Sequence, residues 1–175
     1  MVVLTIRQFG DPVLKEKCMP VEKVDKEIEE LIKNLADTMH AAPGIGLAAP
    51  QLGILRQVLI LDLEEGKGLV AYINPKIVSA SSNLVEDEEG CLSVPEVKVA
   101  IKRPEKIVVQ ALNSRGKKVK FEADNLLARA IQHEIDHLNG ILILDRVSGK
   151  ERREALLKLS GVLPTHSDKK DPTIL

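Results

Sequence analysis

The sequence is poor in aromatic residues, with two Phe, one Tyr and no Trp among 175 residues. Proteins that read single-stranded nucleic acids stack the bases on aromatic side chains, so this shortage argues against that class. The formal net charge of −1 provides no strong positive field to attract nucleic acids or a membrane surface. We therefore expect no sequence-specific nucleic-acid binding, no membrane association and a core of aliphatic side chains.

Cysteines and long apolar runs are equally scarce. Cys18 and Cys91 are the only cysteines, too few for a disulfide scaffold. The longest apolar runs, such as residues 58–61, fall far short of the roughly 20 residues of a membrane-spanning helix. Residues 1–7 lack the apolar segment of a signal peptide. These absences favour a reducing cytoplasm, where a cysteine near histidines is more readily a metal ligand or a catalytic group.

The residues that are present fit one globular domain. Hydrophobic residues make up 44% of the chain and charged residues 29%, and a chain of this length can bury enough surface to fold without disulfides. We expect a single domain over residues 1–163. Residues 164–175 are polar and contain two prolines, so we expect a loose tail there.

Residues 25–40 show the spacing of an amphipathic helix. Ile28, Leu31 and Leu35 fall on one stripe, because side chains three and four positions apart share a helix face. Asp25 is a suitable N-cap for this segment. We therefore predict an amphipathic helix near the N-terminus.

A second helical pattern covers residues 124–139. Its apolar side chains lie on opposite sides of the helix, which indicates burial on both sides. His133 and His137 are therefore expected inside the domain rather than on a solvated face. A third helix, highly charged, is predicted over residues 150–160.

Between and after these helices, short runs rich in β-branched residues predict strands. The turn cluster at residues 113–116 indicates a hairpin between the two strands that flank it. The predicted strands are residues 57–63, 70–73, 97–102, 106–112, 117–121 and 141–144.

The most informative pattern is His133-Glu134-Ile135-Asp136-His137 on the second predicted helix. Histidines at positions i and i+4 project from one face and can bind one metal ion. Glu134 points aside from that face, so it is placed to contact a water on the metal rather than the metal itself. Two buried histidines held only by hydrogen bonds are the structural alternative, which is costly without a metal or a polar network.

A catalytic metal site needs a third protein ligand and one open position. His166 lies in the predicted tail, and Glu151 and Glu154 lie on a charged helix that is a poor place for a buried ligand. Cys91 is the better candidate, because a thiolate binds borderline-soft divalent ions well and Gly90 permits close backbone approach. A small buried core cysteine is the alternative interpretation of Cys91.

Residues 44–51 form a segment rich in Gly and Ala. It matches neither phosphate-binding glycine pattern, and its small residues would let a ligand or a strand pack closely against the backbone. Gln51 offers a neutral amide donor that could stabilise a developing oxyanion. Taken alone, the segment could equally be a tight turn.

Together, three segments of the chain resemble the peptide deformylase family. The family pattern G-x-G-x-A-A-x-Q is matched by residues 44–51, E-G-C-x-S by residues 89–93, and Q-H-E-x-D-H-x-x-G by residues 132–140. The resemblance implies an α+β fold in which antiparallel β-sheets pack around a central helix that carries the HExxH motif. It also implies removal of the N-formyl group from the N-terminal formyl-methionine of newly made polypeptides, with release of formate.

The resemblance further implies a role for each motif residue. Cys91, His133 and His137 would bind one divalent metal ion, and a water on that ion would attack the formyl carbon. Glu134 would act as general base and then as general acid. The Gln51 side chain and the Leu92 backbone N–H would stabilise the oxyanion. The ion implied is Fe²⁺ in the cell, with Zn²⁺, Ni²⁺ or Co²⁺ possible in isolated protein.

The resemblance also implies a pocket for the methionine side chain, lined by Ile45, Leu126, Arg129, Ala130 and His133. The peptide backbone would pair as a strand with the Ile45 and Gly46 segment. Arg129 stands where the family commonly has an aliphatic residue, and we expect its stem to line the pocket while its head reaches water. Glu89 and Arg103 are expected to form an ion pair near the site.

Nascent formyl-methionyl chains would be the substrate, and the charged helix at residues 150–160 is a candidate contact for the ribosome. Two other interpretations of the HExxH motif stay open. A small zinc peptidase would use the same motif, and a metal-stabilised binding module would have no turnover. The sequence offers no obvious Glu or His as the third ligand of a peptidase, and no candidate for the fourth protein ligand that would close a structural metal site.

Overall fold

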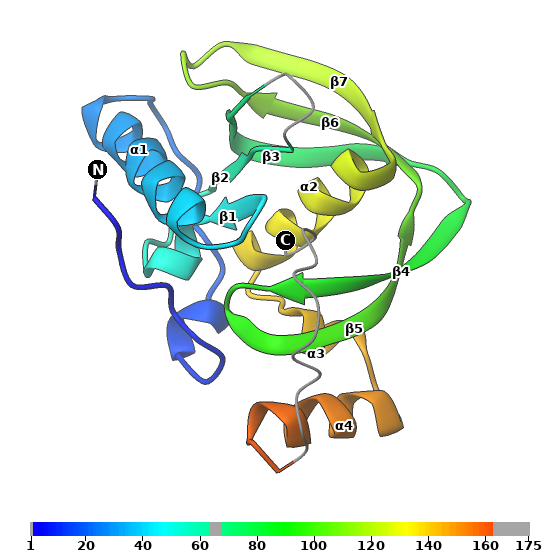
Figure 1. The fold of residues 1–175 in the computed structure, drawn as a ribbon. Helices are drawn as coiled ribbons and strands as arrows, with labels where there is room; N and C mark the ends of the chain where they lie inside the picture. Colours follow the sequence, from blue (N-terminus) through cyan, green and yellow to red (C-terminus); the bar gives the residue numbers. More distant parts are fainter. Residues whose placement is uncertain (1, 64–67, 163–175) are drawn as a thin grey trace.

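The structure is a computed structural model that describes residues 2–63 and 68–162. The elements of this part, shown in Figure 1, follow one another along the chain as η1 (Pro12–Lys15), α1 (Lys26–Ala41), β1 (Gly46–Ala48), η2 (Ala49–Leu52), β2 (Val58–Leu61), β3 (Val70–Ala80), β4 (Leu84–Cys91), β5 (Val94–Pro104), β6 (Lys106–Leu112), β7 (Lys118–Asp124), α2 (Asn125–Leu138), α3 (Ile143–Arg146) and α4 (Gly149–Leu159). The expected tail over residues 164–175 lies outside the described residues.

The strands form two antiparallel sheets. Five of them pair in the order β1-β2-β3-β6-β7, and β4 pairs with β5 in a separate hairpin. The predicted hairpin across residues 113–116 is the β6–β7 pair, in which Lys106 faces Asp124 and Leu112 faces Lys118. The expected combination of antiparallel sheets with helices is confirmed.

Helix α2 lies between the two sheets. In Figure 1 it runs in yellow below strands β3, β6 and β7 of the five-stranded sheet and above the β4–β5 hairpin. Ala130 and Ile131 of α2 pack with Leu59 of β2 and Val109 of β6 in one core cluster. Because both sides of α2 are covered, a side chain on either side of this helix can be held away from water.

Strand β2 joins this core to a second one. Leu59 and Leu61 belong to the cluster around α2, whereas Val58 and Ile60 pack with Leu35 and other residues of α1 on the opposite face. Alternate side chains of a strand point to opposite faces, so both faces of β2 are buried and its sequence is a continuous apolar run. The largest fully buried side chains of the described part are Leu, Ile and Met, as the scarcity of aromatic residues predicts.

A third cluster sits under the β4–β5 hairpin. Val99 and Ile101 of β5 pack against Ile143 and Leu144 of α3 and against Ala155 of α4. The prediction of a strand over residues 141–144 is wrong, because this segment turns into the short helix α3. The Asp145 carboxylate accepts a hydrogen bond from the Leu142 N–H at 2.8 Å, which closes a turn that the apolar composition does not reveal.

Strand β4 was not predicted from the sequence, because residues 84–88 are all exposed and mostly acidic. Its pairing with β5 orders it, and the register brings Glu89 opposite Val99 and places Cys91 at the end of the strand. The predicted strand at residues 70–73 likewise continues to Ala80, past irregularities at Ile73/Lys76 and Ile77/Ser79. In the described part of the chain no helix is long and apolar enough to cross a membrane.

Candidate metal centre

Cys91, His133 and His137 meet between β4 and α2, and we call them the ligand cluster. One ligand atom from each residue lies within 4.8 Å of the other two, and all three residues are buried. The two histidines are one helical turn apart on α2, and Cys91 Sγ lies 3.2 Å from His137 Nε2. Within residues 2–63 and 68–162, this is the one group of its kind that could hold a metal ion.

Four buried polar atoms at the cluster have no hydrogen-bond partner within the described structure. They are His133 Nε2, His137 Nδ1 and both carboxylate oxygens of Glu134. A buried polar atom without a partner costs free energy, so such a concentration in one place calls for a ligand. One thiolate and two imidazoles are a donor set that suits a divalent transition-metal ion. The residues therefore fit a catalytic metal centre.

Burial sets the protonation of the cluster. It raises the pKa of the Cys91 thiol to about 12 and holds the pKa of His137 well below its usual range, with the charges of His133 and Arg103 adding to the effect on His137. His137 is thus neutral and can bind a metal at once. The thiol must lose its proton to the solvent when a metal binds.

Glu134 is fully buried between the two histidines of the motif. Burial, and after it the negative charge of Glu89, raises the pKa of the Glu134 carboxyl well above its usual range. A carboxyl group with a raised pKa can both accept and return a proton near neutral pH. The backbone of β1 passes close to it, since a Cβ atom on Gly46 would lie 2.5 Å from Glu134 Oε1. This contact explains why the segment over residues 44–51 needs glycine there.

Glu89 fixes the orientation of His133 through a contact with its Nδ1 atom. Its Oε2 lies 3.0 Å from His133 Nδ1, and Arg103 donates to Oε1 and Oε2 at 2.6 and 2.9 Å. Burial alone would raise the pKa of Glu89, but the hydrogen bonds from Arg103 and His133 and their charges lower it to about 2. An ionised carboxylate only accepts, so His133 Nδ1 carries the proton and Nε2 is left to bind a metal. The expected ion pair between Glu89 and Arg103 is confirmed.

Arg129 is also held at Glu89, against expectation. Its Nη1 donates to Glu89 Oε1 at 2.6 Å and to the Ile101 carbonyl at 2.9 Å, and its Nη2 donates to the Val85 carbonyl at 2.7 Å. The prediction that the Arg129 head reaches water is wrong, because the residue is 7% exposed. A buried carboxylate and two carbonyls offer the guanidinium better partners than the solvent.

Gln51 brings the glycine-rich segment to the cluster. Its Oε1 accepts from the Ala48 N–H at 2.8 Å, and its Nε2 donates to Ser93 Oγ at 3.2 Å and lies 3.9 Å from Cys91 Sγ. The three sequence segments at residues 44–51, 89–93 and 132–140 therefore converge on one site.

The pocket residues inferred from the sequence also lie together. Ala130 is fully buried in the cluster around α2, and the partly buried Ile45 and Leu126 pack against the same cluster. A cavity of about 210 Å³ lies between the β4–β5 hairpin and the start of α2 and is lined by Leu126, Arg129 and Val85, among others.

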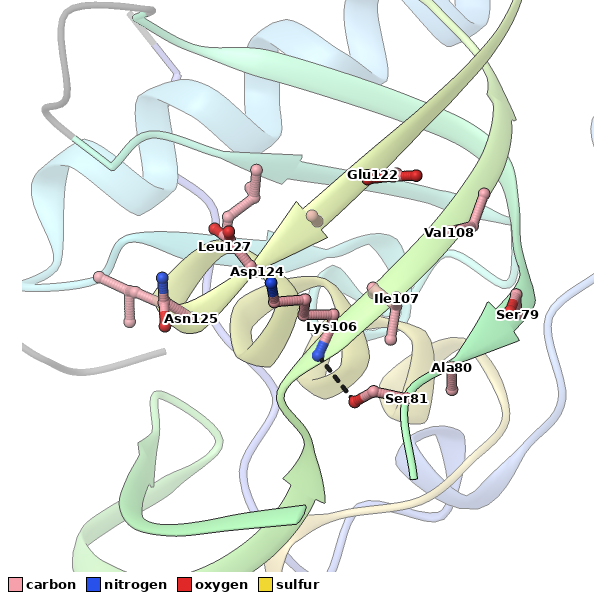
Figure 2. Close-up of a pocket in the computed structure, with 12 residues that line it drawn as sticks. Ser79, Ala80, Ser81, Lys106, Ile107, Val108, Glu122, Asp124, Asn125 and Leu127 are labelled. Carbon is pink, nitrogen blue, oxygen red and sulfur yellow. Dashed lines mark hydrogen bonds between the residues drawn. The ribbon is translucent and has the colours of Figure 1, made fainter. Parts of the chain in front are cut away.

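Two larger cavities differ in whether they reach the ligand cluster. A cavity of about 500 Å³ is lined by Gly90, Cys91 and Leu92, so it opens directly at the ligand cluster. A cavity of about 490 Å³, shown in Figure 2, lies over β6, β7 and the start of α2, with Lys106 and Asp124 on its walls. No residue that the structure shows lining the second cavity belongs to the ligand cluster. The first cavity is therefore the candidate entrance for a substrate.

Comparison with known proteins agrees with the geometry. The model of the polypeptide deformylase family matches residues 3–153. The chain belongs to this family. A peptide deformylase from Halothermothrix orenii is 48% identical over 147 residues, which is 84% of this chain and 95% of that protein.

Solved structures of deformylases share the fold. The crystal structure of a peptide deformylase from Legionella pneumophila has a TM-score of 0.87 at 39% identity and covers 92% of this chain and 95% of its own. The Thermotoga maritima peptide deformylase has a TM-score of 0.81 at 44% identity and covers 85% of this chain and all of its own. The family consists of hydrolases that remove N-formyl groups from nascent peptides.

Sequence reasoning missed two supporting residues of the site. Ser93 is fully buried and accepts the hydrogen bond from Gln51. Asp136 accepts from Arg103 Nη1 and from Arg146 Nε, each at 2.9 Å, and so ties the helix to the Glu89 and Arg103 pair. Both residues lie inside the matched motifs. A polar side chain at a position expected to be buried indicates a hydrogen-bonding role, and this signal could have identified both residues from the sequence.

Proposed function

We propose that this deformylase uses Cys91, His133 and His137 to hold the metal ion with which it removes the formyl group of formyl-methionyl peptides. The observation that carries the proposal is the buried ligand cluster with the unpartnered His133 Nε2 and Glu134 oxygens beside it. A divalent ion bound there supplies Lewis-acid chemistry, since it lowers the pKa of a water and polarises the formyl oxygen.

Glu134 moves the protons of the reaction. Its carboxylate takes a proton from the attacking water and then gives one to the amine that leaves, so that formate and a free N-terminus result. Because burial makes this carboxyl a weaker acid than usual, it holds the proton between the two steps.

The Gln51 amide and the Leu92 backbone N–H stabilise the negative charge that develops on the formyl oxygen. Gln51 Nε2 lies beside Cys91 Sγ, and Leu92 follows Cys91 directly in the chain. The hydrogen bond from the Ala48 N–H to Gln51 Oε1 orients the amide so that its nitrogen faces the ligand cluster.

The methionine side chain lies in a pocket formed by Ile45, Leu126, Arg129, Ala130 and His133. The peptide backbone of the substrate pairs as a strand with the Ile45 and Gly46 segment. Ala130 is buried in one cluster and the partly buried Ile45 and Leu126 pack against that cluster, which supports this assignment.

We infer that Fe²⁺ is the ion in the cell and that Zn²⁺, Ni²⁺ or Co²⁺ can replace it in isolated protein. We further propose one domain over residues 1–163 acting in the cytoplasm on nascent chains. Helix α4 is the candidate ribosome contact, since Lys150 and Lys158 are among its exposed or partly exposed charges. Co-sedimentation with ribosomes that persists after deletion of residues 149–175 would contradict the role of α4.

A panel of three substrates tests the proposed reaction against its rivals. Metal-loaded protein is expected to release formate from formyl-Met-Ala, to leave acetyl-Met-Ala intact, and to leave a peptide blocked at both ends uncut. Cleavage inside the blocked peptide would favour a zinc peptidase. Metal binding without any turnover would favour a binding module, and a small chelating inhibitor then separates the two, because it binds only where a coordination position is open.

A further inference from the structure

We infer that Arg129 is a positioning residue that links the pocket for the first side chain of the substrate to the metal ligand His133 through Glu89. The inference rests on the proposed function for the identity of the ligands and the pocket. It adds a role for the one pocket residue whose charge the proposed function does not use.

The link consists of two contacts at a single carboxylate. Arg129 Nη1 donates to Glu89 Oε1 at 2.6 Å, and Glu89 Oε2 lies 3.0 Å from His133 Nδ1. Glu89 is fully buried, and the Arg129 side chain is 9% exposed. At such burial a charge-assisted hydrogen bond fixes its partners firmly, because water cannot compete for them.

Arg103 alone would leave Glu89 less constrained. Arg103 holds both oxygens of Glu89 but also donates to Asp136, which binds Arg146 in turn. Arg129 approaches Oε1 from α2 and is itself fixed by the carbonyls of Val85 and Ile101. The two arginines thus clamp the carboxylate between the β4–β5 hairpin and the helix that carries His133.

The other end of the link is the cavity of about 210 Å³ between the hairpin and α2. Arg129 lines this cavity together with Leu126 and Val85, and Arg103 lines it as well. A side chain that fills it therefore contacts both arginines that hold Glu89, and Arg129 is the one that comes from the helix carrying His133. Replacing a carboxylate that orients a ligating histidine typically costs about 10-fold to 100-fold in metal affinity or activity, so loss of one of its two arginine supports is expected to act at the lower end of that range.

The first experiment measures the release of bound metal rather than the rate of the reaction. Protein loaded with Co²⁺ is mixed with an excess of a chromogenic chelator, and the rate of metal transfer is measured for wild type, Arg129→Met and Arg129→Lys. We expect Arg129→Met to release Co²⁺ about 10-fold faster than wild type and Arg129→Lys to fall between them, because lysine keeps the charge but loses the forked geometry. The absorption bands of bound Co²⁺ should shift in the same order.

The second experiment separates positioning from simple contact. With formyl-Met-Ala, we expect Arg129→Met to lower kcat about 10-fold while KM changes less, because the altered group is the ligand and not only the pocket wall. Arg152→Met is the matched control. Arg152 also donates to a backbone carbonyl, that of Leu144, and pairs with Asp145 at 3.7 Å, but it lies on α4 away from Glu89.

Wild-type rates of Co²⁺ release in both Arg129 variants, with a raised KM and an unchanged kcat, would overturn the inference and leave Arg129 as a pocket wall only. If Arg129→Met does not fold, Arg129→Lys decides alone, with faster release than wild type supporting the link and equal release refuting it. Absence of formate release by the wild type would refute the proposed function, whereas the chelator assay would still judge the link between Arg129 and the metal ligand.

Discussion

At the scale of single residues, burial shifts the pKa of the thiol and of the imidazole at the site in opposite directions. Burial raises the pKa of the Cys91 thiol and lowers that of the His137 imidazole, so that both are neutral at neutral pH in the absence of a metal. In the proposed metal centre the thiol would lose its proton on metal binding, whereas His137 would bind as a neutral ligand.

This difference predicts the proton balance of metal binding. Wild-type protein should release about one more proton per metal ion than Cys91→Ser at pH 7, because the serine hydroxyl is not expected to ionise. The measurement is calorimetric titration with Co²⁺ in two buffers of different ionisation enthalpy. Equal proton release by the two proteins would show that Cys91 does not bind the metal as a thiolate.

At the scale of elements, the approach of β1 to α2 explains the glycine-rich segment. A Cβ at Gly46 would meet Glu134 Oε1 at 2.5 Å and Leu61 Cδ2 at 2.8 Å. At Gly44 a Cβ would meet only the Leu92 side chain within 3.4 Å, with Cδ1 at 2.7 Å. This half-buried side chain lines the cavity of about 500 Å³, into which it can turn. The two glycines therefore differ in what a methyl group would displace.

We predict that Gly46→Ala lowers kcat for formyl-Met-Ala by about 10²-fold, because a catalytic group moved by an ångström loses its alignment. Gly44→Ala should lower it much less. Both variants should remain folded, as judged by their circular dichroism and denaturation midpoints. An equal loss of activity in the two variants would contradict a specific contact between Gly46 and Glu134.

The turn after α2 is the second place where one element meets another at a glycine. Gly140 has a φ of +73°, and a Cβ there would lie 2.4 Å from the Lys15 carbonyl oxygen. Gly149 also has a positive φ, +57°, but a Cβ there would meet nothing within 4 Å. Both substitutions impose a left-handed alanine, and only the first adds a clash with backbone.

We expect Gly149→Ala to reduce the free energy of unfolding by about 1 kcal/mol, the cost of the left-handed conformation. Gly140→Ala should cost at least about 2 kcal/mol, because the main chain of Lys15 must move as well. Urea denaturation of both variants measures the difference. Losses of the same size would mean that the contact with Lys15 adds nothing.

The sequence predicts a helix or strand well where a single regular pattern of apolar residues identifies it. The apolar spacing in residues 25–40 and 124–139 corresponds to α1 and α2, since burial of a regular face is visible in the order of residues. Strand β4 could not be predicted, because its acidic, exposed residues are ordered only by pairing with β5. Arg129 was misjudged for a similar reason, since its partners Glu89, Ile101 and Val85 are distant in sequence.

At the scale of the whole molecule, the N-terminal segment is tied to the end of α2 and to α3. The Cys18 N–H donates to the Leu138 carbonyl at 2.9 Å, and Lys15 pairs with Asp145. Asp145 also accepts from the Leu142 N–H. Burial alone would raise the pKa of Asp145, but the bonds from Lys15 and Leu142 outweigh it and hold the pKa below its usual range.

This shift predicts how the stability of the protein depends on acid. A carboxyl whose pKa is lowered by folding stabilises the fold above its unfolded pKa of about 3.9, and this contribution is lost as the pH falls through the lower folded pKa. The stability of wild type should therefore exceed that of Asp145→Asn at pH 6, and the gap should close below about pH 4. Denaturation midpoints at several pH values measure it, and a gap that stays constant down to pH 2 would contradict the prediction.

The central claim is that a metal ion at Cys91, His133 and His137 and the carboxylate of Glu134 together hydrolyse the formyl group. The most direct test measures formate release from formyl-Met-Ala by wild type and Glu134→Ala, both loaded anaerobically with Fe²⁺ or with Ni²⁺ and both assayed for bound metal. We predict that both proteins bind the metal ion equally and that Glu134→Ala loses at least about 10²-fold in rate. Release of formate by metal-loaded Glu134→Ala at the wild-type rate would show that another group moves the protons.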